Sequence, residues 1–368
     1  MTMTINNEHK KLNVPNLRFP EFKGEWEMCK FKDVCSTSTG NKNTQDKIDD
    51  GIYPFYVRSQ TVERINSWTF DGEAILTAGD GVGVGKVFHH TYGKIGVHQR
   101  VYILSNFKCD ANYLFHFFSS NFYNRVKRMS AKNSVDSVRK EMITEMPLYL
   151  PSEQEQTKIG VLLSLLDERI ATQNKIIEDL KKLKSAISKK LLCNDKWTTY
   201  KIQDIAEIGR GRVISSVEID RQKHPLYPVY SSQTSNNGIM GYLDNYMFDG
   251  EYITWTTDGA NAGTVFYRKG KFNCTNVCGT LKILPKFDCY FVSLVLQQAT
   301  QKYVSSNLAN PKLMNNTMAS IKIRMPNIET QKQLSKVFQT LDSCLLVHQR
   351  TCKMYLSEKQ YLLRQMFI

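Results

Sequence analysis

The 368-residue sequence has no run of 18 apolar residues, and its first 16 residues, MTMTINNEHKKLNVPN, are mostly polar and contain no apolar core. A membrane-spanning helix needs about 20 consecutive, mostly apolar residues. A secretory signal needs a shorter apolar stretch close to the N-terminus. We therefore predict no membrane span and no export signal, and we expect the protein to be cytoplasmic.

Pairs of closely spaced cysteines are also missing, because none of the nine cysteines forms a CxxC motif. Cys274 and Cys278 have a spacing seen in zinc sites, but no second pair of ligands follows at a suitable distance. Disulfides are rare in cytosolic proteins, so we expect the cysteines to be small buried apolar residues. The sequence predicts no metal site.

The motifs of common DNA-modifying enzymes are absent as well. The sequence has no two adjacent prolines, which the [DNS]PP[YF] loop of an amino-methyltransferase requires. The segment GDGVGVGK (79–86) fits neither GxGxxG nor GxxxxGK[ST], so a hairpin turn explains it better than a phosphate-binding loop. No cluster of carboxylates suggests a nuclease metal site. We predict no catalytic residues and no cofactor for this chain.

Positive charge is what the sequence has in excess. Lys and Arg number 49 and Asp and Glu 35, which gives a net charge of +14. Neutralising phosphates releases condensed counterions, so a balance this basic favours nucleic acid as the partner. The alternative is a lysine-rich surface that serves only solubility.

Two similar phrases, YPFYVRSQT (53–61) and YPVYSSQT (227–234), begin 174 positions apart. Downstream, residues 71–90 match residues 249–268 at a constant offset of 178. Solenoid units recur every 20–50 residues, so this repeat indicates duplication of a whole domain. Each copy has the pattern of a strand, a tight DG turn and a strand, then a helix and an alternating strand.

Two long segments, 151–192 and 326–367, have no interior proline, and their apolar residues recur mostly at steps of three and four. A helix of about 40 residues is about 60 Å long, and a single small domain cannot cover so long an apolar stripe. We predict that the two helices pair antiparallel within one chain. Two separate bundles or an oligomeric coiled coil are the alternatives.

The predicted fold class is therefore α+β: two similar globular domains separated by a pair of long antiparallel helices (a coiled coil), with an internal pseudo-twofold duplication. The expected boundaries are an N-terminal arm (1–25), a first domain (26–150), a first helix (151–193), a second domain (194–325) and a second helix (326–368).

Two stretches resemble a known family. LRFPEFKGEWE (17–27) resembles the N-terminal signature of specificity subunits of type I restriction-modification systems, and LPSEQEQTKIGVLLSLLDERI (150–170) resembles the start of their central helical region. The order of two target-recognition domains and two long helices matches the family over essentially the whole chain. The second helix departs from the pattern, because PNIETQKQ (326–333) lacks the EQ pair of PSEQEQTK (151–158).

The resemblance implies a non-catalytic subunit in which each globular domain reads one half of a bipartite, asymmetric site in double-stranded DNA. The helices would set the spacing and dock two methyltransferase subunits, which bind S-adenosylmethionine. Two motor-nuclease subunits would complete the complex, with ATP and Mg²⁺ on the partners. The alternative is a two-headed protein-binding scaffold with a coiled-coil spacer.

Polar and basic loop residues are the candidates for DNA contact, because Arg, Asn, Gln, Ser and Thr read base edges while Lys and Arg bind phosphates. In the first domain they are Arg58, Ser59, Gln60, Thr61, Lys86, Arg125, Lys127, Arg128, Lys132, Asn133 and Arg139. In the second domain they are Arg210, Arg212, Ser232, Gln233, Thr234, Asn236, Asn237, Asn310, Lys312 and Asn315. The loops after the two YP phrases could equally be ordinary turns. From the resemblance, Glu153, Gln154, Glu155 and Gln156 are expected to bind a partner subunit.

Overall fold

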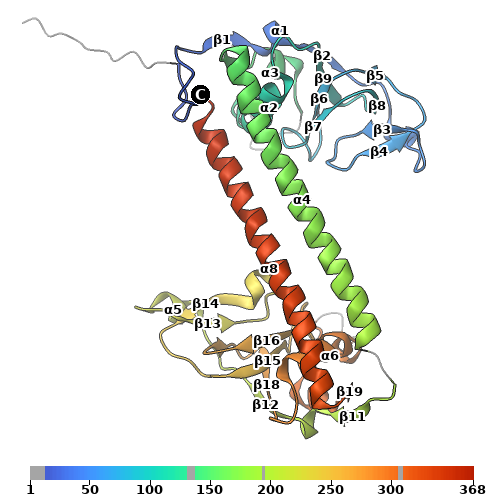
Figure 1. Ribbon diagram of the computed structural model, residues 1–368, viewed down its shortest axis with the longest axis vertical. Coiled ribbons are helices and arrows are strands. Elements are labelled where there is room, and N and C mark those ends of the chain that lie inside the picture. Colours follow the sequence, from blue (N-terminus) through green and yellow to red (C-terminus); the bar gives the residue numbers. More distant parts are fainter. Residues whose placement is uncertain (1–12, 131–136, 193–194, 306–309) are drawn as a thin grey trace, which may run out of the picture. The chain divides into compact units, whose positions relative to one another are not determined.

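The computed structural model describes residues 13–130, 137–192, 195–305 and 310–368 (Figure 1). The chain forms two compact units. Unit 1 comprises Met1–Asn174 and Gln349–Ile368, and unit 2 comprises Lys175–His348. The two long helices are α4 (Glu153–Leu191) and α8 (Ile328–Gln365), and each unit includes a part of both.

Unit 1 contains two four-stranded sheets and a two-stranded sheet. The main sheet has the order β2-β9-β6-β7, formed by Ser36–Thr39, Val101–Ser105, Ala74–Ala78 and Phe88–Thr91. The second sheet has the order β4-β3-β8-β5, formed by Glu63–Ile65, Tyr53–Tyr56, Lys94–Val97 and Phe70–Asp71. The third pairs β1 (Glu27–Lys30) with β10 (Pro147–Leu150). The short helices are α1 (Phe31–Val34), α3 (Lys140–Thr144) and the 3-10 turn η1 (Thr44–Asp46), and the longer one is α2 (Ala111–Met129).

Unit 2 repeats this plan. Its main sheet has the order β12-β18-β15-β16, formed by Ala206–Arg210, Cys278–Ile283, Glu251–Thr256 and Val265–Lys269. Its second sheet has the order β14-β13-β17, formed by Ile239–Leu243, Tyr227–Tyr230 and Asn273–Cys274. The third pairs β11 (Thr198–Lys201) with β19 (Lys322–Met325). Its helices are α5 (Ser216–Asp220), α6 (Cys289–Ala299), α7 (Asn315–Ser320) and the 3-10 turns η2 (Ile202–Asp204), η3 (Ser235–Gly238) and η4 (Thr300–Tyr303). The matching strand orders confirm the predicted α+β class and the internal duplication.

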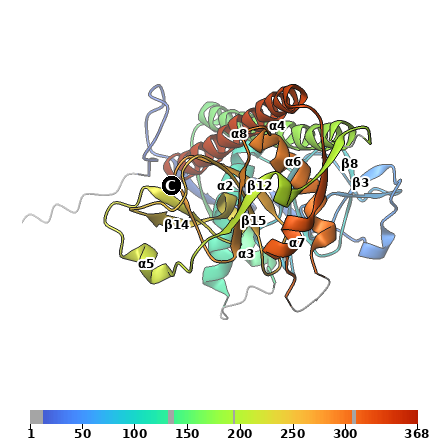
Figure 2. The same cartoon turned by 90° about the horizontal axis from the view of Figure 1, so that it is seen from below.

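One helix packs on the main sheet of each unit and begins with the same cap. The Asp110 carboxylate accepts a hydrogen bond from Tyr113 N (2.9 Å) at the start of α2. The Asp288 carboxylate accepts one from Phe291 N (2.8 Å) at the start of α6. Such a cap satisfies a backbone N–H that has no partner inside the helix. Figure 2 shows α6 beside β15, with which it is in contact.

A glycine occupies the same place at the end of the first strand of both main sheets. Gly40 N donates to Val101 O, and Gly211 N donates to Cys278 O. A Cβ on either glycine would lie 2.1 Å from a carbonyl oxygen, that of Val97 in unit 1 and of Cys274 in unit 2. This backbone approach leaves room only for glycine, which explains why both copies have one here.

The predicted tight turn between two strands of the main sheet is wrong. β6 and β7 are antiparallel as expected, but residues 79–87 connect them, and residues 257–264 connect β15 and β16. The loop of unit 1 folds inward, since Val84 and Val87 are buried. The DG pair begins this loop rather than forming a two-residue hairpin, although Gly81 and Gly259 do adopt positive φ.

The prediction that the apolar stripes of the two long helices pack against each other in a helical seam is correct only in part. Within unit 1, Lys359 pairs with Asp167 and Cys352 Sγ contacts Asn174 Oδ1 (3.4 Å), so the parts of α4 and α8 in this unit run antiparallel. Ile159 and Leu163 are different, because they lie in the core with α2 rather than in the seam. The first turns of α4 therefore complete the core of the globular domain.

The end of each long helix also contributes to a core. Met366 and Phe367, which follow α8, belong to the core of unit 1, and Phe367 lies edge-on to Tyr113 at 5.3 Å between ring centroids. Leu192, which follows α4, belongs to the core of unit 2. Among the described residues, no helix is long and apolar enough to cross a membrane.

Candidate nucleic-acid interface

In unit 1, three predicted DNA-contacting segments meet at one carboxylate. Asp80, in the loop after β6, accepts a hydrogen bond from Arg58 Nη1 (2.8 Å) and lies 3.6 Å from Arg100 Nε. The same residue forms a β-bridge with Ser137, and Val138 N donates to Gly79 O (2.7 Å). The loop after β3, the loop after β6 and the segment before α3 therefore form one surface.

Unit 2 joins the corresponding loop and segment at an equivalent carboxylate, with cations from other positions. Asp258 lies 178 positions after Asp80, and its carboxylate accepts from Arg210 Nη2 (3.1 Å) and lies 3.9 Å from Lys312 Nζ. The residue forms a β-bridge with Lys312, and Leu313 N donates to Thr257 O (2.8 Å). A carboxylate among cations at this position is thus a shared feature of both units.

These charges remain partly open to solvent. The side chains of Arg58 and Asp80 are 43% and 27% exposed, and those of Arg210 and Asp258 are 35% and 22% exposed. Ion pairs of this exposure contribute little to stability. Their main effect is to orient cationic groups at a loop surface, where such groups can bind phosphate or base edges.

The loop that follows β3 rests on the last strand of the main sheet. His89 Nε2 lies 3.1 Å from Ser59 O, and its ring centroid lies 4.9 Å from that of Tyr56. A carbonyl oxygen only accepts hydrogen bonds, so Nε2 carries the hydrogen. Burial lowers the pKa of His89, so a structural role suits this side chain better than a phosphate contact.

The loop that follows β13 is held from several sides. Ser232 O accepts a hydrogen bond from Asn261 Nδ2 (2.9 Å), which links it to the loop after β15. The Gln233 side chain donates to Ile239 O at the start of β14. Thr234, Asn236 and Asn237 are exposed. The exposed members of this predicted set remain the candidates for base contact.

At the C-terminal end of α2, the predicted basic residues have different environments. Lys127 and Arg128 are exposed. Arg125 donates to Met142 O (2.7 Å) and Glu145 O (2.8 Å), so it ties α2 to α3. Lys86 lies over the Tyr123 ring, 5.2 Å from its centroid. Arg125 is thus occupied within the fold, whereas the two exposed residues can reach a phosphate.

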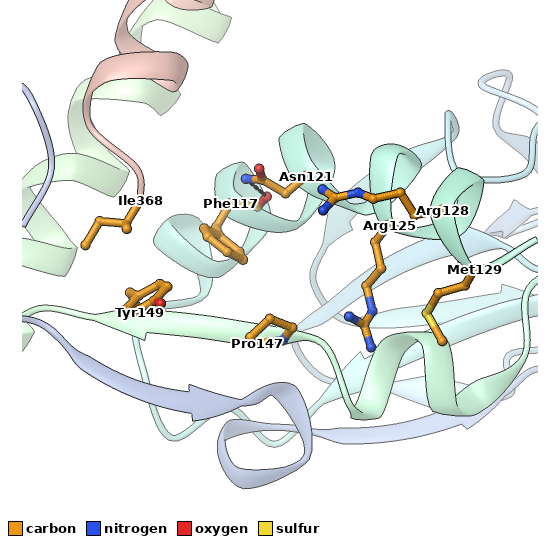
Figure 3. A pocket seen from close by; sticks show the side chains of 8 residues that line it. All are labelled: Phe117, Asn121, Arg125, Arg128, Met129, Pro147, Tyr149 and Ile368. Carbon is orange, nitrogen blue, oxygen red and sulfur yellow. Dashed lines mark hydrogen bonds between the residues drawn. The ribbon is translucent and has the colours of Figure 1, made fainter. Parts of the chain in front are cut away.

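A hollow of about 220 Å³ lies beside this helix (Figure 3). Its lining comprises Phe117, Asn121, Arg125, Arg128, Met129, Pro147, Tyr149 and Ile368. Asn121 is turned back onto its own helix, where its side chain donates to Phe117 O (3.0 Å). The hollow borders the predicted basic segment without containing the other DNA candidates.

The remaining candidates are spread over both units. Arg139 is exposed just before α3, and Gln60 and Thr61 are exposed after β3. Arg212 forms a salt bridge with Glu218, and Asn315 Nδ2 lies 3.5 Å from Gly209 O. Asn310 is exposed. Lys132 and Asn133 lie outside the described residues.

Two of the four predicted partner-binding residues are buried in the core of unit 1. Glu155 is 1% exposed and accepts two hydrogen bonds from Arg18 (2.8 and 2.7 Å). Gln156 is 6% exposed, accepts from Asp110 N and donates to Pro151 O. Glu153 and Gln154 are exposed at the start of α4. Only the latter pair is accessible to another protein.

The second helix keeps one of the residues that its sequence was expected to lack. Gln331 is 1% exposed, accepts from Asp288 N (2.9 Å) and donates to Pro326 O (2.8 Å). These bonds are the same as those of Gln156. The match is visible in the sequence as a glutamine five residues after the proline in both helices, although the second helix lacks the preceding glutamate.

A family model described as the type I restriction modification DNA specificity domain matches residues 23–182 and, a second time, residues 194–353. The chain belongs to this family. The two matches of this specificity family fall on the two copies of the duplication, and the family resemblance predicted from the sequence is confirmed.

Curated relatives and a solved structure of the specificity family are similar to this chain. A putative type I specificity subunit of Mycoplasma pneumoniae is 37% identical over 198 residues, which are 53% of this chain and 82% of the relative. The N-terminal part of another from the same organism is 46% identical over 147 residues, 39% of this chain and 76% of the relative. The crystal structure of the S subunit of a type I system from M. genitalium has a similar fold, with a TM-score of 0.78, 17% identity and coverage of 96% of this chain and 99% of that chain.

Proposed function

We propose that this protein selects the DNA sequence for a type I restriction-modification complex, with each unit reading one half of a bipartite, asymmetric site. One observation carries the proposal. Both units join the loop after an equivalent strand to the segment before a short helix at an equivalent carboxylate, Asp80 or Asp258, but surround it with different cations. A repeated scaffold with unlike loops is suited to reading two unlike sequences.

DNA is favoured over a protein partner by the charge of the loops. Arg58, Arg210, Lys312 and Arg128 are accessible cations on the loop surfaces and the adjoining helix end. Phosphate contacts of this kind supply most of the sequence-independent affinity of DNA-binding proteins. Exposed amides such as Asn236 supply the hydrogen-bonding groups that distinguish bases.

We further propose that α4 and α8 set the distance between the half-sites. Two modules on one face of DNA must be spaced by about 34–36 Å per helical turn, or by a multiple of it. A continuous helix is stiff enough for this, because every backbone group along it is hydrogen-bonded. One chain with two unlike domains would read an asymmetric site, whereas a homodimer would read a palindrome.

The helices are also the proposed docking surface for two methyltransferase subunits. With Glu155 and Gln156 buried, the accessible residues on α4 include the predicted Glu153 and Gln154 and the apolar Val161 and Leu165, which are 47% and 50% exposed. Neighbouring exposed apolar side chains mark interaction sites, and Val161 and Leu165 lie one turn apart on α4. The specificity subunit of a type I system is non-catalytic, so methyl transfer with S-adenosylmethionine, and the Mg²⁺- and ATP-dependent steps of two motor-nuclease subunits, belong to the partners.

A randomised-site selection with the full chain and its methyltransferase subunits tests the proposal. We expect a bipartite consensus, and we expect Asn236→Ala to reduce discrimination about tenfold at one half-site only, since one good base contact contributes about 1–3 kcal/mol. Arg128→Ala is the matched control. It should leave both half-sites unchanged but lower the slope of log K against log salt by about 0.9. A scaffold that binds proteins would select no DNA sequence at all.

A further inference from the structure

A buried arginine lies beneath the loop that we propose reads bases in unit 2. Arg268, on β16, is 3% exposed, and its Cζ lies 3.5 Å from the ring centroid of Tyr230 and 4.4 Å from that of Phe266. Burial lowers its pKa to about 10, so it keeps its charge at neutral pH. Among the described residues, no carboxylate forms a salt bridge with it. Stacking on aromatic faces stabilises the charge instead.

The hydrogen bonds of Arg268 join the sheet to this loop. Its Nε donates to Thr254 Oγ1 (3.1 Å) on β15, and its Nη1 donates to Asn237 O (2.9 Å) in the loop. The planar guanidinium has donors in a fixed geometry, so one side chain can hold both partners at once. A lysine at this position would have one nitrogen and could not reproduce this bridge.

The loop needs such support because its backbone is unusual. Asn236, Asn237 and Gly238 follow one another with φ values of +47°, +54° and +84°. Left-handed backbone costs an L-residue about 1–2 kcal/mol, less for asparagine and nothing for glycine. Ser231 N closes the loop by donating to Gly238 O (2.9 Å). An exposed loop with these dihedrals keeps one conformation only when other groups hold it.

Unit 1 has a comparable contact on the equivalent strand, one residue earlier in the repeat: His90 lies 178 positions before Arg268, and the contact comes from His89. β7 and β16 are the equivalent end strands of the two main sheets, and Tyr56 and Tyr230 are the equivalent last tyrosines of the YP strands. His89 on β7 packs on Tyr56 and donates to Ser59 O, as described above. In each unit, therefore, a nitrogen from the end strand passes the tyrosine ring and binds a carbonyl of the next loop.

We infer that Arg268 and His89 are positioning residues for DNA readout, each holding the loop after the YP strand in the one conformation that presents its side chains to bases. This inference rests on the proposed function. Arg268 is too deeply buried to contact DNA itself, and its Nε and Nη1 already donate to Thr254 and Asn237. A loop ordered before binding does not lose that conformational entropy when DNA arrives, which favours both affinity and discrimination.

The test compares Arg268→Met and His89→Phe in the full chain with its methyltransferase subunits, in the same randomised-site selection. We expect Arg268→Met to reduce discrimination about tenfold at the half-site of unit 2 and to leave that of unit 1 unchanged. His89→Phe should do the reverse. Both should leave the salt slope unchanged, because neither removes a phosphate contact. Arg268→Lys keeps the charge and should still reduce discrimination at the half-site of unit 2.

The outcomes separate positioning from other roles. Thermal unfolding shows whether Arg268→Met still folds, and Arg268→Lys provides the result if it does not. A salt slope lowered by about 0.9 would make Arg268 a direct phosphate contact and overturn the inference. If both half-sites stay intact in the Arg268 and His89 variants while Asn236→Ala alters one, the inference is wrong and the proposed function stands. If no sequence is selected even by the unaltered chain, the proposed function itself is wrong.

Discussion

The two units share a scaffold but secure the start of the long helix in different ways. In unit 1 the buried Glu155 binds Arg18 of the N-terminal arm, whereas unit 2 has Thr330 at the equivalent position. In unit 2 the Ser335 hydroxyl donates to Asp288 Oδ1 (2.6 Å), whereas unit 1 has Gly160 there. Residues that bind backbone groups, such as Gln156 and Gln331, are the same in both. The hydrogen bonds from these side chains to backbone groups are therefore the same in both units. The side-chain pairs that fix the start of the long helix differ between them.

Replacing Glu155 of unit 1 by threonine, the residue at the equivalent position of unit 2, should lower the free energy of unfolding the most. Glu155→Thr leaves the Arg18 guanidinium, which is 16% exposed, without its carboxylate. Removing one partner of a largely buried pair costs about 3–5 kcal/mol, and we expect about 3 kcal/mol because Arg18 keeps its bond to Gly24 O (2.6 Å). Urea unfolding followed by hydrogen exchange would locate the loss in unit 1.

The reciprocal exchange, Thr330→Glu, is the control. A carboxylate in the first turn of a helix interacts favourably with the helix dipole, so this variant should change the free energy of unfolding by less than about 0.5 kcal/mol. If the two exchanges lowered the free energy of unfolding equally, both units would hold the start of their long helix in the same way. That result would contradict the difference described above.

The second largest difference between the two units is expected in the pH dependence of their stability. His116 on α2 is 1% exposed, its Nε2 lies 3.2 Å from Ser164 Oγ, and burial lowers its pKa to about 3. Its unfolded pKa is about 6.5, so between these values the unfolded state binds one more proton than the folded state. The free energy of unfolding of unit 1 should therefore fall as pH falls below 6.5, by about 2 kcal/mol at pH 5.

Unit 2 has Leu294, 3% exposed, where unit 1 has His116. His116→Leu should remove this contribution from the pH dependence while changing stability little at pH 7.5. Urea unfolding at pH 5.0 and 7.5, with the variant subtracted from the unaltered chain, measures it. An unchanged difference between the two pH values would mean that His116 is protonated in the folded state.

Among the destabilising changes, the smallest effect is expected from Ser335→Gly. The variant loses one buried hydrogen bond, worth about 1 kcal/mol, and about 0.5 kcal/mol of helix propensity. The same unfolding measurement should thus show unit 2 weaker by about 1.5 kcal/mol. The converse, Gly160→Ser, would place a Cβ 2.8 Å from Asp110 Oδ1 and 2.9 Å from Tyr113 N, so it should destabilise unit 1 rather than add the missing bond. A stabilised Gly160→Ser variant would refute this account.

Much of the fold could be predicted because it depends on local patterns. The absence of proline and the steps of three and four predicted α4 and α8 closely, and the repeat predicted two copies of one α+β domain. The partners of buried polar residues could not be predicted in this way. Glu155 meets Arg18 across 137 positions, and no periodicity indicates which of two neighbouring glutamates faces inward.

The candidate site also has a part that the sequence predicted and a part that depends on contacts between distant residues. Asp80 and Asp258 were visible as matched residues of the repeat, but their role at the loop junction depends on cations distant in sequence. Arg268 was missed because an arginine within a strand is ordinarily expected to face solvent. Its burial results from the rings of Tyr230 and Phe266, which only the folded sheet brings together with it.

The core that contains Met366 and Phe367 has a consequence for protein synthesis. Unit 2 is one continuous stretch of chain, but unit 1 draws on residues from both ends of the sequence. A ribosome makes most of unit 1 first and its closing segment last. The core of the domain that is translated first therefore stays incomplete until the second domain has been translated. Until then the rings of Tyr113 and Phe117 lack their contact with Phe367.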